Sequence, residues 1–490
     1  MNRVLVDVVG TTAEEFKEKD FRYTMSLQST TREKNGRMFS NGFAGRTCGR
    51  NAMSKTVTVG LSLAMGLAIG VAGGSRLMNP PAEAQTATAP ASFSAVPGAI
   101  GAQDISGPYE VQEGWPKDLA TLPGHEKWTY GGARGIFAES PNRVFLLGGG
   151  ELPAMRRPAT RLLPDIGPNV QFPVPGLPWR NANTASPPGA GGSRQDPAKG
   201  MEMWRGDKPP YREMGVDSRW HHSIIVVDAQ GNLIEDWTQW DNMFKRPHAV
   251  YISPYDAQKH VWIVDDHTHA IYKFTNDGKQ LVQTIGTPNV PGADGTHFNR
   301  PTFMAWLPDG TFFVADGYNG TRVAKFDASG KFLLDFGKSG EPEKETRPGY
   351  MNNVHGVAVD VETRRVFVND RDNHRIQIFD ENGKYLSEWK IAVKPSSLHF
   401  VVIGADRTLA TFDRNTHKML KYDLDGRLLY AWGTVGDFPG TLWGVHGMAT
   451  DQEGNLYVAE VDSGRFQKFR PRPGANPATL IGKPIYSAWQ

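Results

Sequence analysis

Three histidines recur at matching places in the chain and could together bind one metal ion. They are His248 in RPHAV, His355 in NVHGVAV and His446 in GVHGMAT, and each starts a short apolar run. Two equivalent runs between them carry Thr302 and Ser396 instead. If the repeats form a ring, the histidines come from alternate members and meet at its centre. Three imidazoles with an open fourth position are typical of catalytic zinc. The alternative is that they only line a polar channel and bind water.

A tyrosine and an arginine follow the second apolar run of two adjacent repeats, in Asp316-Gly317-Tyr318 and Asp370-Arg371. We interpret the recurring acid as a hydrogen-bond acceptor in the turn. An ordinary tyrosine, with a pKa of about 10, is a poor base at neutral pH, but a nearby metal ion and guanidinium favour its phenolate. Tyr318 and Arg371 could therefore act as a general base and its electrostatic partner. The alternative is a rim tyrosine beside an ion-paired arginine.

The elements that must position these residues belong to a repeat that begins near Arg134. Each copy holds four β-rich runs separated by Asp-Gly, Asn-Gly or Ser-Gly turns, which predicts a four-stranded antiparallel sheet. The first β-rich run of each copy begins near residue 248, 302, 355, 396 or 446. The copies therefore recur every 41 to 54 residues, which is the period of propeller blades. A further copy is split between residues 134–147 and 223–237. The sequence therefore predicts an all-β, six-bladed propeller rather than an open solenoid or stacked sandwiches.

Two further features of the propeller follow from the same pattern. Residues 148–220 are rich in Pro, Gly, Arg and Trp and show little periodicity, which predicts a long loop insertion in the first blade. A ring that did not close would expose sheet edges, so we expect residues 109–115 to add the outer strand of the last blade. The C-terminal stretch ATLIGKPIYSAW is the alternative closing strand.

The N-terminal residues predict export. Residues 57–72 form an apolar run after Lys55, and Ala82-Glu83-Ala84 is a small-x-small cleavage motif. The run is short for a transmembrane span, so an uncleaved anchor is the less favoured alternative. We interpret residues 1–52 as a polar extension that translation from Met53 would omit, 53–84 as a signal peptide, 85–107 as a flexible leader, and 108–490 as the propeller. The predicted location is periplasmic or secreted.

Composition excludes several classes of function. A net charge of +2 predicts neither nucleic-acid nor acidic-membrane binding. The single cysteine, Cys48, precludes an intrachain disulfide and a thiolate metal cluster, so a metal ion would need histidine, carboxylate or backbone oxygen ligands. Two other histidine clusters, His221-His222 and the loop at 265–269, have no obvious third ligand. Because neighbouring residues on a strand point to opposite faces, we predict that both clusters lie on a solvated surface.

Over residues 108–470 the sequence resembles the NHL-repeat propellers, and within them the peptidyl-α-hydroxyglycine α-amidating lyases. The resemblance is carried by DGYNGTR at 316–322, VHGVAV at 354–359 and DRDNHRIQIF at 370–379. It implies a zinc ion on the three channel histidines, His248, His355 and His446. It also implies that Tyr318 is the catalytic tyrosine and Arg371 the active-site arginine.

Two positions depart from the family pattern. The last zinc histidine of the family is followed by an aspartate that helps to hold a structural calcium ion, whereas Gly447 follows His446 here, which disfavours Ca²⁺. A second family arginine, at the exit of the first blade, would fall near residues 148–149, which are glycines. Arg134 or Arg205 is the candidate substitute.

The resemblance implies a zinc-dependent lyase that cleaves an N-acyl-α-hydroxyglycine-type carbinolamide to an amide and glyoxylate. We expect a small-molecule or peptide-derived substrate, a monomer, no nucleic-acid partner, and no membrane partner unless the signal segment is retained. The alternative function is a non-catalytic exported NHL propeller that binds a protein or glycan. A calcium-dependent, lactonase-like propeller is disfavoured, because its channel would need carboxylates and asparagines where this chain has histidines.

Overall fold

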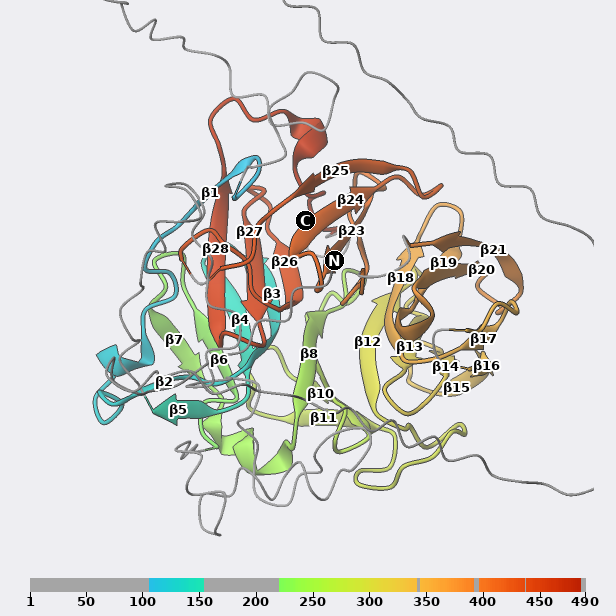
Figure 1. The fold of residues 1–490 in the computed structure, drawn as a ribbon. Coiled ribbons are helices and arrows are strands. Elements are labelled where there is room, and N and C mark those ends of the chain that lie inside the picture. Colours follow the sequence, from blue (N-terminus) through green and yellow to red (C-terminus); the bar gives the residue numbers. More distant parts are fainter. Residues whose placement is uncertain (1–104, 154–219, 342–343, 392–395, 437, 486–490) are drawn as a thin grey trace, which may run out of the picture. The chain divides into compact units, whose positions relative to one another are not determined.

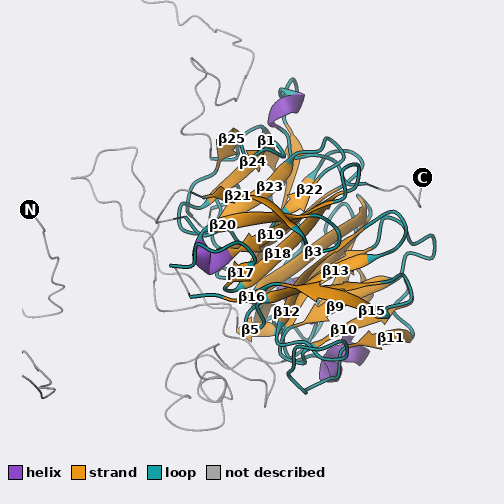
Figure 2. Cartoon of the chain, turned by 90° about the vertical axis from the view of Figure 1, so that its right-hand side faces the viewer, coloured by secondary structure: helices purple, strands orange, loops and turns teal. Residues whose placement is uncertain are grey.

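The computed structural model describes residues 105–153, 220–341, 344–391, 396–436 and 438–485. This part of the chain is built from β-strands, and its helices are short 3₁₀ turns (Figure 2). No helix in these ranges is long and apolar enough to cross a bilayer. The predicted extension, the signal peptide, most of the leader and most of the insertion lie outside the described residues, so those assignments stay predictions.

The strands form six four-stranded antiparallel sheets arranged as the blades of a propeller, which confirms the predicted fold class (Figure 1). The first blade is split as expected, since β4 ends at Gly148 and β6 begins at Ile224. From the innermost strand outward, blades one to three are β3, β4, β6, β7 (Ala133–Ser140, Arg143–Gly148, Ile224–Val227, Leu233–Asp236); β8 to β11 (Pro247–Ile252, Val261–Asp265, Ala270–Phe274, Leu281–Ile285); and β12 to β15 (Pro301–Trp306, Phe312–Asp316, Arg322–Phe326, Phe332–Phe336). Blades four to six are β18 to β21 (Val354–Asp360, Arg365–Asp370, Arg375–Phe379, Tyr385–Lys390); β22 to β25 (Val402–Ile403, Leu409–Asp413, Lys418–Tyr422, Leu428–Trp432); and β26, β27, β28, β1 (Val445–Thr450, Leu456–Glu460, Arg465–Pro471, Tyr109–Val111).

The ring closes through the N-terminal strand, as predicted. Strand β1 pairs antiparallel with β28, with Tyr109 opposite Pro471. Tyr109 is fully buried, and its hydroxyl accepts a hydrogen bond of 2.8 Å from the backbone N–H of Ile481. The described part of the alternative closing segment forms a 3₁₀ turn, η7 (Pro477–Thr479), and then packs without a strand. Closure by β1 removes the free sheet edge of the last blade.

Burial of the strands follows their place in the blade. The second strands β9, β13 and β27 are buried at every residue, because both faces of each blade pack against neighbouring blades. Outer strands such as β7 and β15 alternate between half-buried and exposed residues. Aromatic side chains join the blades: the ring centroids of Trp262 in β9 and Phe312 in β13 lie 5.3 Å apart.

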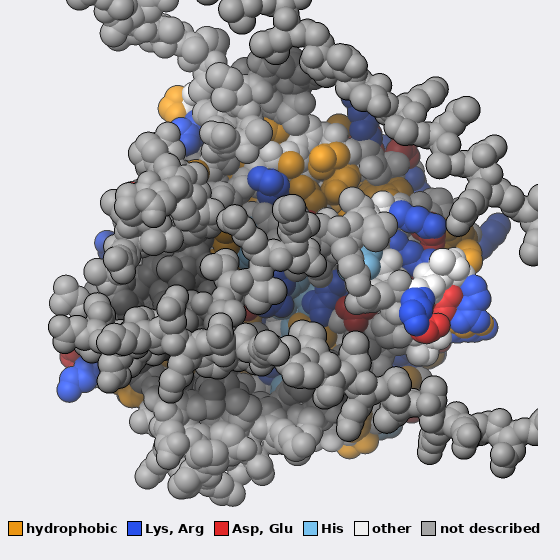
Figure 3. Space-filling model, in the orientation of Figure 1, with side chains coloured by type: hydrophobic (Ala, Val, Ile, Leu, Met, Phe, Trp, Pro, Cys, Tyr) orange, Lys and Arg blue, Asp and Glu red, His pale blue; other side chains and the backbone are white. Residues whose placement is uncertain are grey.

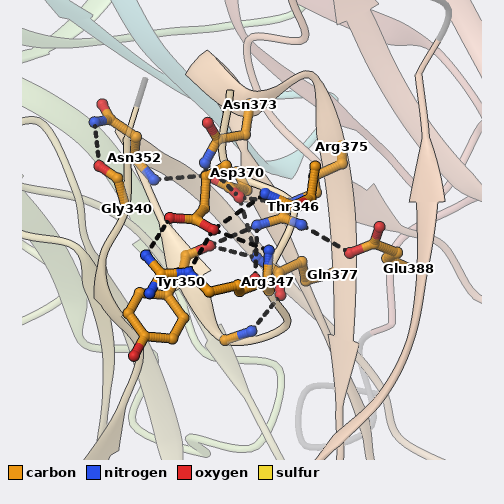
Figure 4. A network of polar contacts seen from close by, with 12 residues as sticks. Gly340, Thr346, Arg347, Tyr350, Asn352, Asp370, Asn373, Arg375, Gln377 and Glu388 are labelled. Carbon is orange, nitrogen blue, oxygen red and sulfur yellow. Dashed lines mark hydrogen bonds and ion pairs between the residues drawn. The ribbon is translucent and has the colours of Figure 1, made fainter. Parts of the chain in front are cut away.

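An acidic residue at the end of the second strand fixes the chain as it enters the first strand of the same blade. Figure 4 shows the fourth blade, where Asp370 accepts hydrogen bonds from the backbone N–H of Asn352 at 2.7 Å and from Arg375 Nε at 2.8 Å. Gln377 also donates to this carboxylate, at 3.0 Å. The contact holds Asn352 close to the first residue of β18 and thereby places His355.

The same acid recurs around the ring in the structural role that the sequence predicted. Asp316 accepts from the backbone of Asn299, and Asp413 accepts from the backbone of Ser397. In the second blade the acid is Asp265, which accepts from the backbone N–H groups of Lys245 and Arg246. Asp266, the next residue, has a different role, which is described below with the site.

Candidate active site

The three repeated histidines converge at the centre of the ring. His248, His355 and His446 are each the second residue of an innermost strand, β8, β18 and β26. All three are buried, and their ring centroids lie 4.4 to 5.3 Å apart. One ligand atom from each lies within 4.8 Å of the others. The ring geometry expected from the repeat therefore brings all three together.

A local irregularity turns these histidines into the channel. Pro247 pairs with Asp265 and Ala249 with Val264, so His248 is an extra residue without a partner in the register of β8 and β9. Strands β18 and β26 show the same shift at their histidines. A bulge of this kind re-aims one side chain relative to the pleat. The apolar neighbours can therefore stay in the interface between blades while the imidazole points inward.

Backbone carbonyls select the tautomer of each histidine. Nδ1 of His248 donates to the carbonyl of Thr302 at 2.9 Å, and Nδ1 of His446 donates to that of Arg134 at 2.7 Å. His355 makes the same bond to the carbonyl of His399. A carbonyl can only accept, so the proton is on Nδ1 and Nε2 carries the lone pair that a metal ion would use.

Burial keeps the three imidazoles neutral. It lowers the pKa of His446 to about 3 and holds the pKa values of His248 and His355 well below the usual value, with neighbouring charged and histidine side chains adding to the effect. A metal ion binds the neutral imidazole. Three neutral histidines with unprotonated Nε2 atoms close to one another fit zinc, or another divalent metal ion that accepts nitrogen ligands.

The channel residue of the fifth blade is His399, and our assignment of Ser396 to that place was wrong. His399 is buried, and its Nδ1 donates to the carbonyl of Val445 at 2.8 Å. Ser396 lies further out, where its carbonyl accepts from His374. The error arose because the first strand of this blade, β22, is only two residues long and gives a weak strand pattern. The string LHFVV around His399 nevertheless matches VHGVA around His355.

Tyr318 places its hydroxyl against two of the candidate ligands. The oxygen lies 3.1 Å from Nε2 of His248 and 2.7 Å from Nε2 of His355. The backbone N–H groups of Gly317 and Tyr318 both donate to the carbonyl of Arg300, which fixes the loop after β13. The tyrosine that the sequence singled out is thus at the centre of the histidine group.

Gly317 is required by close packing beside the site. A Cβ atom added there would lie 1.4 Å from the carbonyl oxygen of Val354, the residue before His355. We expect Gly317→Ala to destabilise the protein by about 1–3 kcal/mol, the usual cost of overpacking, and to weaken metal binding by displacing His355. Denaturant unfolding and metal content check this. Gly148→Ala is the matched control, since the nearest atom to its added Cβ is 3.9 Å away; equal effects of the two changes would contradict the explanation.

Three guanidinium groups surround the ring of Tyr318. The Cζ atoms of Arg300, Arg246 and Arg371 lie 4.5, 4.9 and 5.4 Å from its centroid. Arg371 follows β19 in the 3₁₀ turn η6 (Arg371–Asn373), as the repeat predicted. Cations at these distances are attracted to the face of the aromatic ring. The predicted pair of Tyr318 and Arg371 is therefore part of a larger cationic group.

Asp266 organises two of these arginines. Its Oδ1 accepts from Nε of Arg246 at 2.7 Å, and its Oδ2 accepts from Nη2 of Arg300 at 2.7 Å. Burial works to raise the pKa of Asp266, but the two guanidinium groups hold it well below its usual range. One carboxylate thus positions two cations and neutralises only one of them.

Arg134 reaches the same region from the first blade. A Cβ atom at Gly149 would lie 2.8 Å from Nη2 of Arg134, so this guanidinium lies beside the exit of the first blade, where the family has its second arginine. Burial and repulsion from Arg246 lower the pKa of Arg134 to about 10. Arg205, the other candidate, lies outside the described residues.

These groups line one cavity of about 360 Å³ at the mouth of the channel. Figure 3 shows histidine and basic side chains gathered near the middle of this face. Five of the lining residues are arginines and one is a carboxylate, so the cavity suits an anionic ligand. The lining consists of Arg134, Arg246, His248, Arg300, Tyr318, Asn353, Arg371, Asp372, His399, Arg414, His446 and Val461.

Sequence reasoning missed several of these residues, although the signals were present. Arg246 and Arg300 each stand immediately before a proline and a channel residue, in RPH and RPT. Arg414 holds the place of Arg371 in the next blade, directly after the recurring acid. Its guanidinium pairs with Asp462 at 2.8 Å. Comparison of the residues that precede the first strand and follow the second strand of each blade, rather than of the histidines alone, would have found all three arginines.

Gly447 has little room for the aspartate that the family carries. A Cβ atom there would lie 3.0 Å from the carbonyl oxygen of Arg134 and 3.2 Å from Cα of Gly135. Among the described residues, the groups of three or more histidine, cysteine or acidic residues that converge on one point are two histidine clusters. The expectation that Ca²⁺ is disfavoured therefore stands as a prediction.

The prediction of a solvated surface for the other two histidine clusters was wrong. His222 and His267 are both buried, at 6% and 9% exposure, as are Asp265 and Asp266. At residues 265–269 the loop turns into the channel mouth and contributes to the arginine network. At His221-His222 a third histidine, His125, comes from a distant part of the chain.

Comparison with known proteins agrees with this architecture. Residues 351–379 match the NHL repeat family. Peptidyl-α-hydroxyglycine α-amidating lyase 1 of Drosophila melanogaster is 29% identical over 300 residues, which cover 57% of this chain and 52% of the relative. Lyase 2 of the same species is 37% identical over 113 residues, which are 23% of this chain and 27% of the relative. The matched region thus spans about half or less of each lyase.

Two further similarities concern proteins of other names. NHL repeat-containing protein 3 of Mus musculus is 27% identical over 275 residues, covering 52% of this chain and 74% of the relative. The crystal structure of virginiamycin B lyase from Staphylococcus aureus shares 14% identity with a TM-score of 0.40, over 74% of this chain and 99% of that chain.

The fold and the site define the class of the protein: it is a six-bladed β-propeller with a buried histidine cluster in its channel, and its residues 351–379 match the NHL repeat. Within that class, the chain is homologous to the peptidyl-α-hydroxyglycine α-amidating lyases.

Proposed function

We propose that this protein is an exported, zinc-dependent lyase that cleaves the C–N bond of an N-acyl-α-hydroxyglycine-type carbinolamide to an amide and glyoxylate. The observation that carries the proposal is the contact of the Tyr318 hydroxyl with Nε2 of His248 and His355 inside an arginine-lined cavity. The names of the homologous lyases supply the reaction type. The substrate is a small molecule or a peptide-derived compound.

His248, His355 and His446 would hold the zinc ion. When bound, zinc supplies Lewis acidity, which lowers the pKa of a coordinated hydroxyl group and polarises a carboxylate. The second coordination layer is already present, because each Nδ1 donates to a backbone carbonyl that fixes the ring. These histidines therefore have both the tautomer and the orientation that the role requires.

The chain's own residues account for the movement of the proton. Tyr318, as phenolate, takes the proton of the substrate hydroxyl, and the oxygen electrons form the aldehyde carbonyl of glyoxylate as the C–N bond breaks. The departing nitrogen takes that proton back from the phenol and leaves as a neutral amide. The guanidinium groups of Arg246, Arg300 and Arg371 lie around the Tyr318 ring and offset the negative charge of the substrate during the transfer.

The arginines also provide a reason for the choice of substrate. A glycine-derived carbinolamide carries a free carboxylate next to the reacting carbon. Arg134, Arg371 and Arg414 line the cavity around the histidines and can pair with this group. Neutralisation of the carboxylate by methylation should therefore cost more affinity than shortening of the acyl group.

The test is release of glyoxylate from α-hydroxyhippurate by the purified, zinc-loaded chain. The expected result is catalytic turnover that is lost on removal of zinc by a chelator and restored by added zinc, with little turnover of the methyl ester. No glyoxylate from a protein with full metal content would contradict the proposed reaction and favour the non-catalytic, partner-binding propeller.

A further inference from the structure

A second group of histidines lies outside the channel, at the base of the first-blade insertion. His125 follows the 3₁₀ turn η1 (Leu119–Thr121), whereas His221 and His222 lie just before β6, separated from it by Ser223. The ring centroid of His125 lies 5.6 Å from that of His221 and 4.7 Å from that of His222. One ligand atom from each of the three lies within 4.8 Å of the others. Two separate parts of the chain thus supply three imidazoles to one point.

The backbone of His222 explains why two neighbouring histidines face the same way. In an extended strand their side chains would point to opposite faces. His222 instead has a φ of +54°, in the left-handed region that residues other than glycine seldom adopt. As a result the rings of His221 and His222 lie only 4.2 Å apart. Strained backbone of this kind persists where the surroundings fix it, which is common at binding sites.

A fully buried carboxylate completes the group. Glu151, in β5 (Glu151–Pro153), is 0% exposed, and its Oε1 lies 2.8 Å from Nδ1 of His125 and 2.5 Å from Nδ1 of His222. Strand β5 pairs with β2 (Trp128–Tyr130) outside the blade, which sets Glu151 beside His125. A charge buried to this degree is costly without a paired cation or a metal ion.

Two further acids lie around the histidines. Asp236 Oδ2 lies 3.2 Å from Nε2 of His222, and Asp241 Oδ2 lies 3.5 Å from Nδ1 of His221. In metal sites, carboxylates in this position orient the ligand imidazoles. The complete set is therefore three histidines and a buried glutamate, with a second layer of acids.

This donor set has a definite chemical preference. Three imidazole nitrogens with one carboxylate give the four protein ligands of a closed, structural zinc site. Imidazole suits zinc and its neighbours in the first transition series, while Ca²⁺ and Mg²⁺ prefer oxygen ligands alone. The channel cluster, by contrast, offers three histidines and an open side. The two groups are thus suited to different roles.

We propose that His125, His221, His222 and Glu151 bind a second divalent transition-metal ion, of the zinc type, that has a structural role. The ion joins the strand that leads into the insertion, through Glu151, to the residues that follow it, through His221 and His222. Gly149, two residues before Glu151, lies against the guanidinium of Arg134 in the channel cavity. The second site therefore fixes the first-blade edge of the cavity.

The competing explanation is an ion pair without a metal. Although burial works against it, Asp236 and Glu151 raise the pKa of His222 to about 9, so a protonated His222 could satisfy both acids. That arrangement predicts no metal at this place. The metal content of the protein separates the two explanations.

The experiment measures zinc bound per chain in the full-length protein after chelation, reloading and removal of excess metal. We expect two ions in the wild type, one in His125→Ala/His221→Ala, and one in His355→Ala, which lacks only the channel ion. His260→Ala is the matched control and should keep two, because His260 pairs with Asp256 and belongs to neither cluster. Equal zinc content in the wild type and His125→Ala/His221→Ala would overturn the proposal.

A second measurement covers the case in which His125→Ala/His221→Ala does not fold. Zinc added to metal-free His355→Ala should raise its Tm, because a ligand that binds only the folded state stabilises it. No rise in Tm and no bound zinc in His355→Ala would also overturn the second site. Neither result depends on glyoxylate release by the wild type, so failure of this proposal is distinguishable from failure of the proposed reaction.

Discussion

Tyr318→Phe is expected to lower kcat for glyoxylate release by about 10²–10⁴-fold, the usual contribution of a positioned general base, while bound zinc stays at the wild-type level. The change removes one oxygen atom and keeps the ring that Arg246, Arg300 and Arg371 surround. The imidazoles keep their Nδ1 bonds to backbone carbonyls, because Tyr318 contacts only Nε2. The loss should therefore appear in kcat rather than in metal affinity.

Steady-state kinetics with α-hydroxyhippurate, together with zinc analysis, measure this effect. Tyr385→Phe is the control, since Tyr385 begins the outer strand β21 and lies away from the channel. If Tyr318→Phe retained wild-type kcat with full zinc, the assignment of the base would be wrong, although the metal site could stand.

His355→Ala should remove the channel zinc ion and lower kcat/KM by at least about 10³-fold, because a Lewis acid supplies several kcal/mol and each 1.4 kcal/mol is a factor of ten. The ring centroid of His355 lies within 5.3 Å of those of His248 and His446. Its Nε2 is closer to the Tyr318 hydroxyl, at 2.7 Å, than Nε2 of His248, at 3.1 Å. The change also leaves the buried carbonyl of His399 without this donor, at a cost of about 1–3 kcal/mol in stability.

Metal analysis, activity and thermal unfolding should be read together for this variant. A fall in Tm alone would reflect the lost hydrogen bond, whereas loss of one zinc ion per chain identifies a ligand. His260→Ala again serves as the control and should retain both zinc and activity. Full zinc content in a folded His355→Ala protein would refute the three-histidine centre.

The blades were predictable because their information is local. Turns such as Asp-Gly and the alternation of the outer strands recur in each copy, so the six sheets, the split first blade and the closing strand at Tyr109 all followed from the sequence. The same repetition placed His248, His355 and His446 at equivalent positions. Because the blades are regularly spaced around a ring, equivalent positions in the repeats lie at equivalent places around its axis.

The errors arose where the pattern is broken or where contacts are long-range. Strand β22 is too short to show a period, so Ser396 was chosen in place of His399. His222 was assigned to the surface because an extended backbone was assumed, whereas its φ is positive. Its contact with Glu151 spans 71 positions of sequence, and no local pattern predicts such a pairing.

The hydrogen bonds from the channel histidines to the next blade also bear on when the metal site can form. His446 donates to the carbonyl of Arg134, 312 positions earlier in the chain, and so joins the last blade to the first. Its own strand, β26, follows β8 and β18 in the chain. The three candidate ligands can therefore meet only after β26 has been synthesised and the ring has closed. Metal loading would then be a late event, and the compartment in which the chain completes its folding would be the one that supplies the metal.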